Sequence, residues 1–517
     1  MNNSWIGNYS YFRSRISPTK EAIYDYENKI SYTYGDLENR ANLLANYLVE
    51  VLEIDKGDRI AFCTRNCIEL FDAYYATAKI GAILVTYNQL LSENELINMI
   101  NNETPSVLFY EGNIEEKIIR IREKTNISKF IELDGNNNGR CEYKYKDIMN
   151  YKNSDYRECK DLDLEDIHMI IHTGGTTGIP KGAKISHRSL LYNSLSAAMT
   201  FNLSQFDSSY IMTPMFHTAA WSVLTLPILH MGGRIIISKK NEPKLTLKII
   251  NNERPTVLLG VSTLFGMMIK EKEFDSTDYS SLRWILSAAA PTPISTMEKF
   301  WEKGVKFALA YGMTEAGPCN CTTQADCISL DDIKKKHTAV GKPMYFTQVK
   351  VVDDIGNEVE RGQCGELIWS GPGIYSGYWN NEKESNKTLK DGWVYTGDIG
   401  RKDEDGYYYI VGRKKNMFIS GGENIYPPEI ESEIQKHPLV DEVCVIGFPD
   451  EKWGEVGKAI VAVKSNEDLD EEEVIFFLKN NMSSIKIPKY YHFVDNIPKN
   501  SAGKIQRGVL QQLYGMS

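Results

Sequence analysis

Short apolar runs that alternate with helix-forming segments constrain the fold of this chain more than any other feature. The runs VLLG (257–260), RWILS (283–287) and KFALA (306–310) have the length and composition of buried strands. Helical stretches lie between such runs, and one of them, TYGDLENRANLLANYL, opens with Thr33 and Asp36 at the spacing of a capping box. Strands and helices in alternation predict an α/β fold.

The length of the chain predicts more than one domain, because 517 residues exceed what one hydrophobic core usually organises. A basic, glycine-rich passage, GRKKNMFISGGENIYPPEIE (412–431), lies between the long N-terminal stretch and a shorter, compact α/β pattern at the C-terminal end. Its composition suits a hinge. We therefore expect an N-terminal domain of residues 1–412 and a C-terminal domain of residues 413–517.

Composition narrows the class of protein. The chain has 59 basic and 69 acidic residues, and its net charge of −10 argues against binding to nucleic acid. No apolar run is long enough to cross a bilayer, and the first residues lack the apolar segment of a signal peptide. The nine cysteines follow no CxxC or CxxH spacing, so we expect reduced thiols rather than disulfides or zinc ligands. These features predict a cytoplasmic protein without an integral membrane segment.

The segment HTGGTTGIPKGAK (172–184) has the composition of a phosphate-binding loop. Its glycines let the backbone approach a ligand, its threonines offer hydroxyl groups, and its lysines offer positive charge. The run IHMIIH (167–172) predicts a strand and a helix is expected near Ser186, so we expect the loop to connect a strand to a helix. Neither the Walker A spacing nor GxGxxG fits the chain. The sequence thus predicts a phosphate loop of another kind.

Several motifs follow one another along the chain. They are TGGTTGIPKG (173–182), YGMTE (311–315), DGWVYTGD (391–398), GRKKN (412–416), GGENIYPPEIE (421–431) and PKNSAGKIQR (498–507). In this order they resemble the adenylate-forming superfamily of acyl-CoA synthetases, peptide-synthetase adenylation domains and luciferases, and are most similar to fatty or aryl acid–CoA ligases. The resemblance spans residues 31–507. It implies a large N-terminal domain of two βαβ-type subdomains and a distorted β-barrel, with a small mobile α+β C-terminal domain.

The resemblance also implies a reaction in two steps. A carboxylate attacks the α-phosphate of ATP, giving an acyl-adenylate and pyrophosphate, and the thiol of coenzyme A then displaces AMP. A small carboxylic acid, ATP, CoA and Mg²⁺ are therefore the implied substrates and cofactors. The implied nucleotide-binding residues are Thr173, Gly174, Gly175, Thr176, Thr177, Gly178, Lys181, Ala288, Ala289, Ala290, Tyr311, Gly312, Met313, Thr314, Glu315, Asp398, Arg413 and Lys504.

Catalytic roles are implied for Lys504, Thr176 and Glu315. Lys504 would bridge the attacking carboxylate and the α-phosphate as a compact positive charge. Glu315 and Thr176 would hold Mg²⁺, a cation that prefers oxygen ligands. Around the adenosine, Tyr311 would stack on adenine and Asp398 would accept hydrogen bonds from the ribose beside Arg413.

The second step requires the C-terminal domain to rotate, so that Lys504 leaves and a pantetheine tunnel forms. Lys415 stands at the implied hinge, followed by Asn416 where relatives often carry an acidic residue. Gly421, Gly422 and Glu423 are the implied tunnel residues, because glycine puts no Cβ in the path of the thiol arm.

The implied acyl pocket indicates the class of acid. Its residues are His217, Trp221, Gly260, Ala289 and Gly312. Residues 213–224 contain no acidic side chain to pair with an ammonium group, so α-amino acids are disfavoured and a fatty or aryl acid is expected. His217 and Trp221 could instead be core residues, because buried aromatic side chains more often pack than bind.

Two other functions stay open at this point. A carrier-protein phosphopantetheine could accept the acyl group, although the short segment 351–367 favours CoA. A non-catalytic scaffold on the same fold would be expected to lose Lys504, Glu315 or the phosphate loop, and the sequence retains all of them. We expect a monomer or a homodimer. Gly174 and Ala288 depart from the usual family residues, and the sequence leaves the effect of these departures on binding open.

Overall fold

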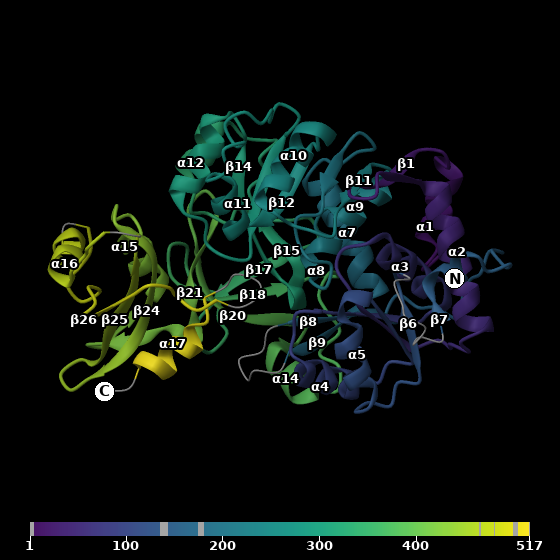
Figure 1. Ribbon diagram of the computed structural model, residues 1–517. Coiled ribbons are helices and arrows are strands. Elements are labelled where there is room, and N and C mark those ends of the chain that lie inside the picture. Colours follow the sequence, from purple (N-terminus) through teal and green to yellow (C-terminus); the bar gives the residue numbers. More distant parts are fainter. Residues whose placement is uncertain are drawn as a thin grey trace.

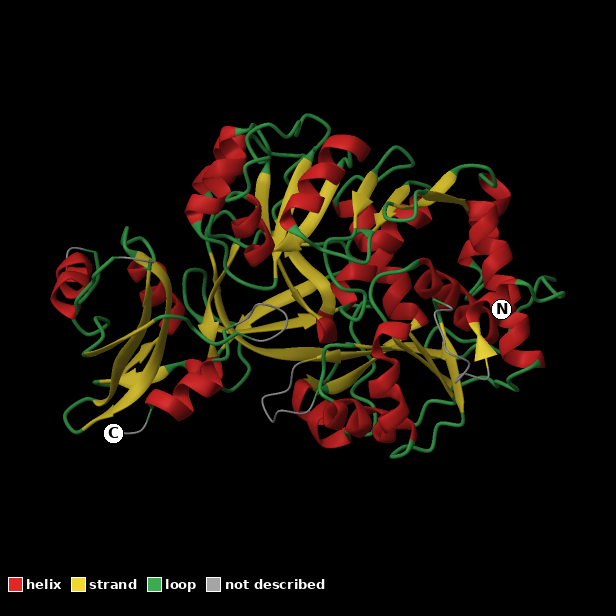
Figure 2. Cartoon of the chain, viewed as in Figure 1, coloured by secondary structure: helices red, strands yellow, loops and turns green. Residues whose placement is uncertain are grey.

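A computed structural model of the protein describes residues 5–134, 143–173, 180–464, 467–479, 481–499 and 505–515. It is a mixed α/β structure in which a large N-terminal part is followed by a smaller C-terminal part, seen at the yellow end of the chain in Figure 1. Figure 2 shows helices covering the sheets of both parts. The predicted fold class is therefore confirmed.

The first large sheet has seven strands. In spatial order they are β7 (Tyr143–Lys144), β6 (Lys129–Glu132), β5 (Val107–Tyr110), β3 (Arg59–Cys63), β4 (Ile83–Tyr87), β8 (Ile167–Thr173) and β9 (Lys181–Ser186). Successive residues of β3 point to opposite faces, so Ile60 and Phe62 join one hydrophobic cluster whereas Ala61 and Cys63 join another. A sheet buried on both faces requires helices on both sides, which explains the continuous apolar runs of its strands.

Helices of this region are α1 (Tyr9–Ile16), α2 (Tyr34–Glu50), α3 (Ile68–Ile80), α4 (Glu93–Glu103), α5 (Glu115–Arg122) and α6 (Tyr145–Met149). Two of them, α2 and α4, begin at capping boxes. The predicted capping box at the start of α2 is confirmed: the Thr33 side chain accepts from the Asp36 amide, and the Asp36 carboxylate accepts from the Thr33 amide.

The predicted phosphate loop connects different elements from those expected. Residues 167–173 form a strand as expected, and α7 (His187–Thr200) begins after its N-cap residue Ser186. However, Lys181–Ser186 form β9, which pairs antiparallel with β8, so the loop joins two strands and not a strand to a helix. The prediction was wrong because Ala183 and Ile185 are buried on β9, while the run around them is too short to show strand periodicity.

A second sheet contains the three apolar runs singled out in the sequence. Its spatial order is β12 (Val257–Val261), β13 (Trp284–Ala288), β14 (Phe307–Met313), β15 (Gly317–Thr322) and β16 (Lys342–Pro343). The first three strands are parallel and the last pairings are antiparallel. Helices of this region are α8 (Thr218–Ser222), α9 (Thr225–Met231), α10 (Pro243–Glu253), α11 (Ser262–Met268), α12 (Ile294–Glu302) and α13 (Leu330–Lys335). The strand predictions for all three runs are confirmed.

Two further sheets complete the N-terminal part. A four-stranded sheet has the order β10 (Ser208–Tyr210), β11 (Arg234–Ile237), β1 (Glu21–Asp25), β2 (Ile30–Thr33). An antiparallel half-barrel has the order β17 (Gln348–Val352), β18 (Gly365–Ser370), β20 (Trp393–Lys402), β19 (Leu389–Lys390), with β21 (Tyr408–Arg413) also paired to β20 and α14 (Glu382–Thr388) ahead of β19. The half-barrel matters for the site because it brings Asp398, in the middle of β20, and Arg413, at the end of β21, beside β14.

The C-terminal part has a sheet of its own with helices on both faces. Its elements are β22 (Phe418–Ser420), β23 (Glu423–Ile425), α15 (Pro427–Ile434), β24 (Val440–Asp450), β25 (Gly454–Val463), α16 (Glu471–Lys479), β26 (Tyr490–Val494) and α17 (Arg507–Tyr514). Ile430 of α15 and Leu478 of α16 join one cluster with Val445, whereas Leu510 of α17 joins the other with Ile446. This part therefore has its own core.

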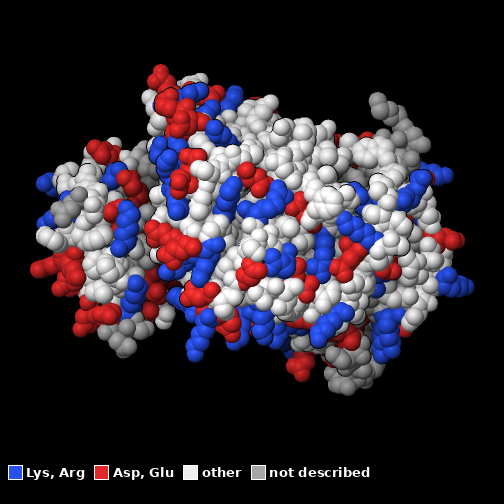
Figure 3. Space-filling view, turned by 90° about the horizontal axis from the view of Figure 1, so that it is seen from above, with Lys and Arg blue, Asp and Glu red and all other residues white. Residues whose placement is uncertain are grey.

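Two further observations concern the distribution of charge and the hydrophobicity of the helices. On the face shown in Figure 3, basic and acidic side chains are interspersed. Within the described ranges, no helix is long and apolar enough to cross a membrane.

Candidate active site

Tyr311, Asp398 and Arg413 meet at one place although they are distant in the sequence. Asp398 of β20 and Arg413 of β21 are register partners, and Arg413 Nε lies 2.5 Å from Asp398 Oδ1. The Tyr311 hydroxyl donates to the other carboxylate oxygen. Asp398 is 3% exposed, whereas the Arg413 side chain is about half exposed. The structure thus gathers these three predicted site residues around one buried carboxylate with an exposed guanidinium at its rim.

The ring of Tyr311 packs against a side chain of the half-barrel. It contacts the fully buried Trp369 of β18 at a centroid distance of 5.8 Å. Burial, and then the neighbouring Asp398 charge, raises the pKa of Tyr311 well above its ordinary value, so its hydroxyl stays a hydrogen-bond donor. A fixed aromatic ring next to a carboxylate that accepts hydrogen bonds suits a nucleoside.

Glu315 lies in the short turn η2 (Thr314–Ala316) between β14 and β15 and is 5% exposed. Tyr378 donates its hydroxyl to Glu315 Oε1 at 2.6 Å. Burial, followed by the Glu315 charge, raises the pKa of Tyr378 above its ordinary value. Among the described residues, no three acidic, histidine or cysteine side chains are placed to hold a metal ion together. Glu315 therefore offers hard oxygen donors but would need further oxygens, such as those of phosphates, to bind a divalent cation.

Lys181 is the first residue of β9, opposite Thr173 at the end of β8. Its ammonium pairs with the carboxylate of Glu384 on α14 and lies 5.3 Å from the centroid of the Tyr378 ring. The hydrogen bond from Lys181 is the main cause of a lowered pKa at Glu384. The base of the predicted phosphate loop thus contacts Tyr378, the residue that donates to Glu315.

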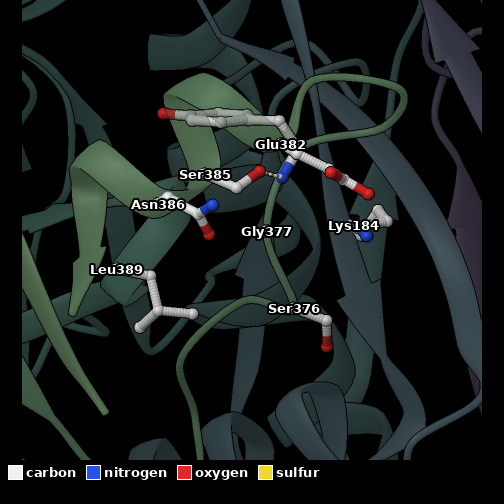
Figure 4. Close-up of a pocket in the computed structure, with 8 residues that line it drawn as sticks. Lys184, Ser376, Gly377, Glu382, Ser385, Asn386 and Leu389 are labelled. Atoms are coloured by element: carbon white, nitrogen blue, oxygen red, sulfur yellow. Dashed lines mark hydrogen bonds between the residues drawn. The ribbon is translucent and has the colours of Figure 1, made fainter. Parts of the chain in front are cut away.

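An open cavity of about 390 Å³ lies beside this cluster. Figure 4 shows Lys184 and Ser376 on one side and Asn386 and Leu389 on the other. Tyr378 forms part of the wall, so the cavity adjoins the cluster around Lys181.

Two of the predicted pocket glycines lie where a side chain would collide with neighbours. A Cβ on Gly312 would lie 2.4 Å from the Pro318 carbonyl oxygen, because β14 and β15 approach closely there. A Cβ on Gly260 would lie 2.7 Å from the Phe265 ring. Ala289 follows β13 with φ +74°, a left-handed conformation that costs a residue with a Cβ about 1 kcal/mol or more. Its neighbours Ala288 and Ala290 flank this turn.

The predicted acyl-pocket aromatic Trp221 lies inside the core. It is 0% exposed, its indole N–H donates to the Met215 carbonyl at 2.6 Å, and its ring stacks on Tyr74 at 5.3 Å. This placement favours the core interpretation, and contact with an acyl group stays a prediction. His217 precedes α8, only partly buried, with its ring 4.5 Å from Phe216.

The remaining predicted residues are divided between described and undescribed parts of the chain. Met313 is the last residue of β14 and Thr314 the first residue of η2, next to Glu315. Lys415 lies in η3 (Lys414–Asn416), where partial burial and the Arg413 charge lower its pKa. Gly421 and Gly422 both have positive φ and precede Glu423 of β23. Gly174, Gly175, Thr176, Thr177, Gly178 and Lys504 lie outside the described residues.

Sequence reasoning missed three residues of this cluster: Trp369, Tyr378 and Glu384. None belongs to the motifs named above, and each acts on a partner far along the chain; Lys181 and Glu384 are 203 positions apart. Tyr378 and Glu384 lie in the segment GYWNNEKES (377–385), between the motifs YGMTE and DGWVYTGD. This location between two predicted site motifs was the one signal in the sequence that could have indicated them.

Comparison with known proteins agrees with the fold. A family model for the AMP-binding enzyme matches residues 13–379, and a model for the AMP-binding enzyme C-terminal domain matches residues 429–504. The chain belongs to the AMP-binding enzyme family, and the resemblance to the adenylate-forming superfamily is confirmed.

Three similar proteins cover nearly the whole chain. A feruloyl-CoA synthase of Amycolatopsis is 31% identical over 517 residues, covering 100% of both chains. A long-chain-fatty-acid–CoA ligase of Bacillus subtilis is 32% identical over 519 residues, covering 95% of this chain and 91% of that protein. The crystal structure of ATP-bound MatB from Rhodopseudomonas palustris is 29% identical, with a TM-score of 0.89 over 100% of this chain and 99% of its own.

Proposed function

We propose that the protein is an ATP-dependent carboxylic acid–CoA ligase that forms an acyl-adenylate and then a thioester. The observation that carries this proposal is the match over the whole chain to relatives named as CoA ligases. The protein is thus an acid–thiol ligase, with ATP and CoA as substrates. The convergence of Tyr311, Asp398 and Arg413 supports a nucleoside site at the junction of β14, β20 and β21.

In this proposal the residues of the cluster divide the work on ATP. The Asp398 carboxylate accepts from the ribose hydroxyls, and Arg413 orients that carboxylate from the rim. Lys181 supplies positive charge to the β- and γ-phosphates from the base of the loop. Lys504 acts on the carboxylate and α-phosphate, where charge develops during adenylation.

Mg²⁺ is part of the proposal because Glu315 suits it. The carboxylate is buried, offers hard oxygen donors, and is oriented by Tyr378 at 2.6 Å. Thr176 is the second proposed ligand. When bound, the cation would neutralise phosphate charge, while Glu315 and Tyr378 keep its position fixed.

The acid is proposed to be aryl or fatty, since the two curated relatives described above act on a feruloyl group and on long-chain fatty acids. The segment 213–224 carries no acidic residue that could pair with an amino group. The proposed division into residues 1–412 and 413–517, with a hinge at Lys415, is supported by the gap between the two matched family models, from 379 to 429. Gly421, Gly422 and Glu423 are the proposed tunnel residues.

The test is ATP–pyrophosphate exchange over a panel of straight-chain fatty acids and substituted benzoic and cinnamic acids. Coenzyme A is then added and thioester formation is followed by mass spectrometry. Exchange with one acid class and thioester on addition of CoA is the expected result. Exchange without thioester would favour a carrier-protein phosphopantetheine as acceptor, whereas ATP binding without exchange with any acid would favour a non-catalytic nucleotide-binding scaffold.

A further inference from the structure

Glu384 holds the lysine at the base of the phosphate loop. It lies in the first turn of α14, and its Oε2 accepts from Lys181 Nζ across 203 positions of sequence. The Lys181 side chain is 16% exposed and the Glu384 side chain 27%, so the pair is shielded on most sides but still reached by solvent. The pairing depends on tertiary structure alone, because β9 and α14 belong to separate segments of the chain.

The same ammonium is also placed against the residue that orients Glu315. Lys181 Nζ lies 5.3 Å from the Tyr378 ring centroid, and the Tyr378 hydroxyl donates to Glu315. Glu384, Lys181, Tyr378 and Glu315 therefore form a chain of contacts. This chain links α14 to the turn that carries the proposed magnesium carboxylate.

We propose that Glu384 is a positioning residue that competes with the triphosphate of ATP for Lys181. It holds the ammonium when no nucleotide is bound, releases it to the phosphates of ATP, and pairs with it again as pyrophosphate leaves. This inference rests on the proposed function, and it concerns the affinity of the site for phosphate groups.

Exchange of partners is physically reasonable for this lysine. An ammonium on a flexible stem is a compact charge that can move between two anions, and a carboxylate and a phosphate attract it in the same way. When Lys181 leaves, the Glu384 carboxylate keeps a second cation nearby, since Lys387 Nζ lies 3.8 Å from its Oε1. Solvent also reaches Glu384, so the released carboxylate is not stranded. The pair therefore weakens phosphate binding without making release of the lysine prohibitive.

The test compares Glu384→Gln with Glu382→Gln. Both variants remove one negative charge from the first turn of the same helix, and Glu382 is exposed at the rim of the adjoining cavity. For Glu384→Gln we expect the Kd of a non-hydrolysable ATP analogue with Mg²⁺, measured by calorimetry, to fall about two- to fivefold, the range for losing one partly exposed ion pair. The inhibition constant for pyrophosphate should fall by a similar factor. Glu382→Gln should leave both values within error of the unmodified enzyme.

A charge-conserving variant and a stability measurement complete the test. Glu384→Asp keeps the charge but shortens its reach, so its constants should lie between those of Glu384→Gln and the unmodified enzyme. Thermal melting should change little, because a partly exposed pair contributes little stability. Unchanged or weaker binding of the analogue by Glu384→Gln, or equal effects in both glutamine variants, would overturn the proposal. If the unmodified enzyme shows no ATP–pyrophosphate exchange, it is the proposed function that fails.

Discussion

Replacing Tyr378 by phenylalanine is expected to destabilise the nucleotide-free protein by about 1.5–3 kcal/mol. The hydroxyl donates to Glu315 Oε1 at 2.6 Å, a short distance typical of a bond to a charged acceptor. Tyr378 and Glu315 are each 5% exposed, so water cannot easily replace the lost donor. The variant therefore loses a charge-assisted hydrogen bond and leaves a buried carboxylate oxygen without that partner.

The assay is equilibrium urea unfolding, with the loss in free energy taken as the shift in midpoint multiplied by a common slope. Tyr375→Phe is the matched control. Tyr375 is 1% exposed, its ring contacts Tyr378 at 5.1 Å, and its hydroxyl makes no hydrogen bond to the Glu315 carboxylate. Removal of the Tyr375 hydroxyl is expected to leave the free energy of unfolding unchanged or to raise it slightly.

Two results would contradict this reasoning about Tyr378. Equal losses in the two phenylalanine variants would mean that packing, and not the hydrogen bond, accounts for the effect. An unchanged midpoint for Tyr378→Phe would mean that Glu315 finds another donor at no cost. The charge-assisted hydrogen bond from Tyr378 to Glu315 would then make no net contribution to the free energy of unfolding.

Three other predictions concern pH, backbone conformation and catalysis. Burial lowers the pKa of His187 to about 4 and that of the stacked His168 well below its usual 6.5. Unfolding therefore takes up protons, and the free energy of unfolding falls as the pH drops from 6.5 to 4, by on the order of 3 kcal/mol for His187. His187→Phe should flatten this pH dependence in urea titrations. Ala289→Gly should raise stability by up to about 1 kcal/mol because φ is +74°, and Ala288→Gly, within β13, should bring no gain. Lys504→Ala should slow adenylation far more than thioester formation from supplied acyl-AMP, and equal losses in both half-reactions would contradict its assigned role.

Local signals in the sequence were enough to identify the family and much of the secondary structure. Thr33 and Asp36 are three positions apart, so their capping box depends only on helix geometry. The three apolar runs became β12, β13 and β14, since a short and mainly apolar segment is typical of a strand that is buried on both faces of a sheet. The order of the motifs predicted the AMP-binding enzyme family, which the family models confirm.

Tertiary structure alone decided which side chains meet. Lys181 pairs with Glu384 and Glu315 binds Tyr378 across 203 and 63 positions of sequence, and no spacing rule predicts contacts between separate strands and helices. The pairing of β9 with β8 likewise came from burial of Ala183 and Ile185 against the sheet. The sequence by itself therefore determined the reaction class and indicated which residues have side chains suited to that reaction. The structure decided how they are held, because long-range contacts depend on how separate elements pack together.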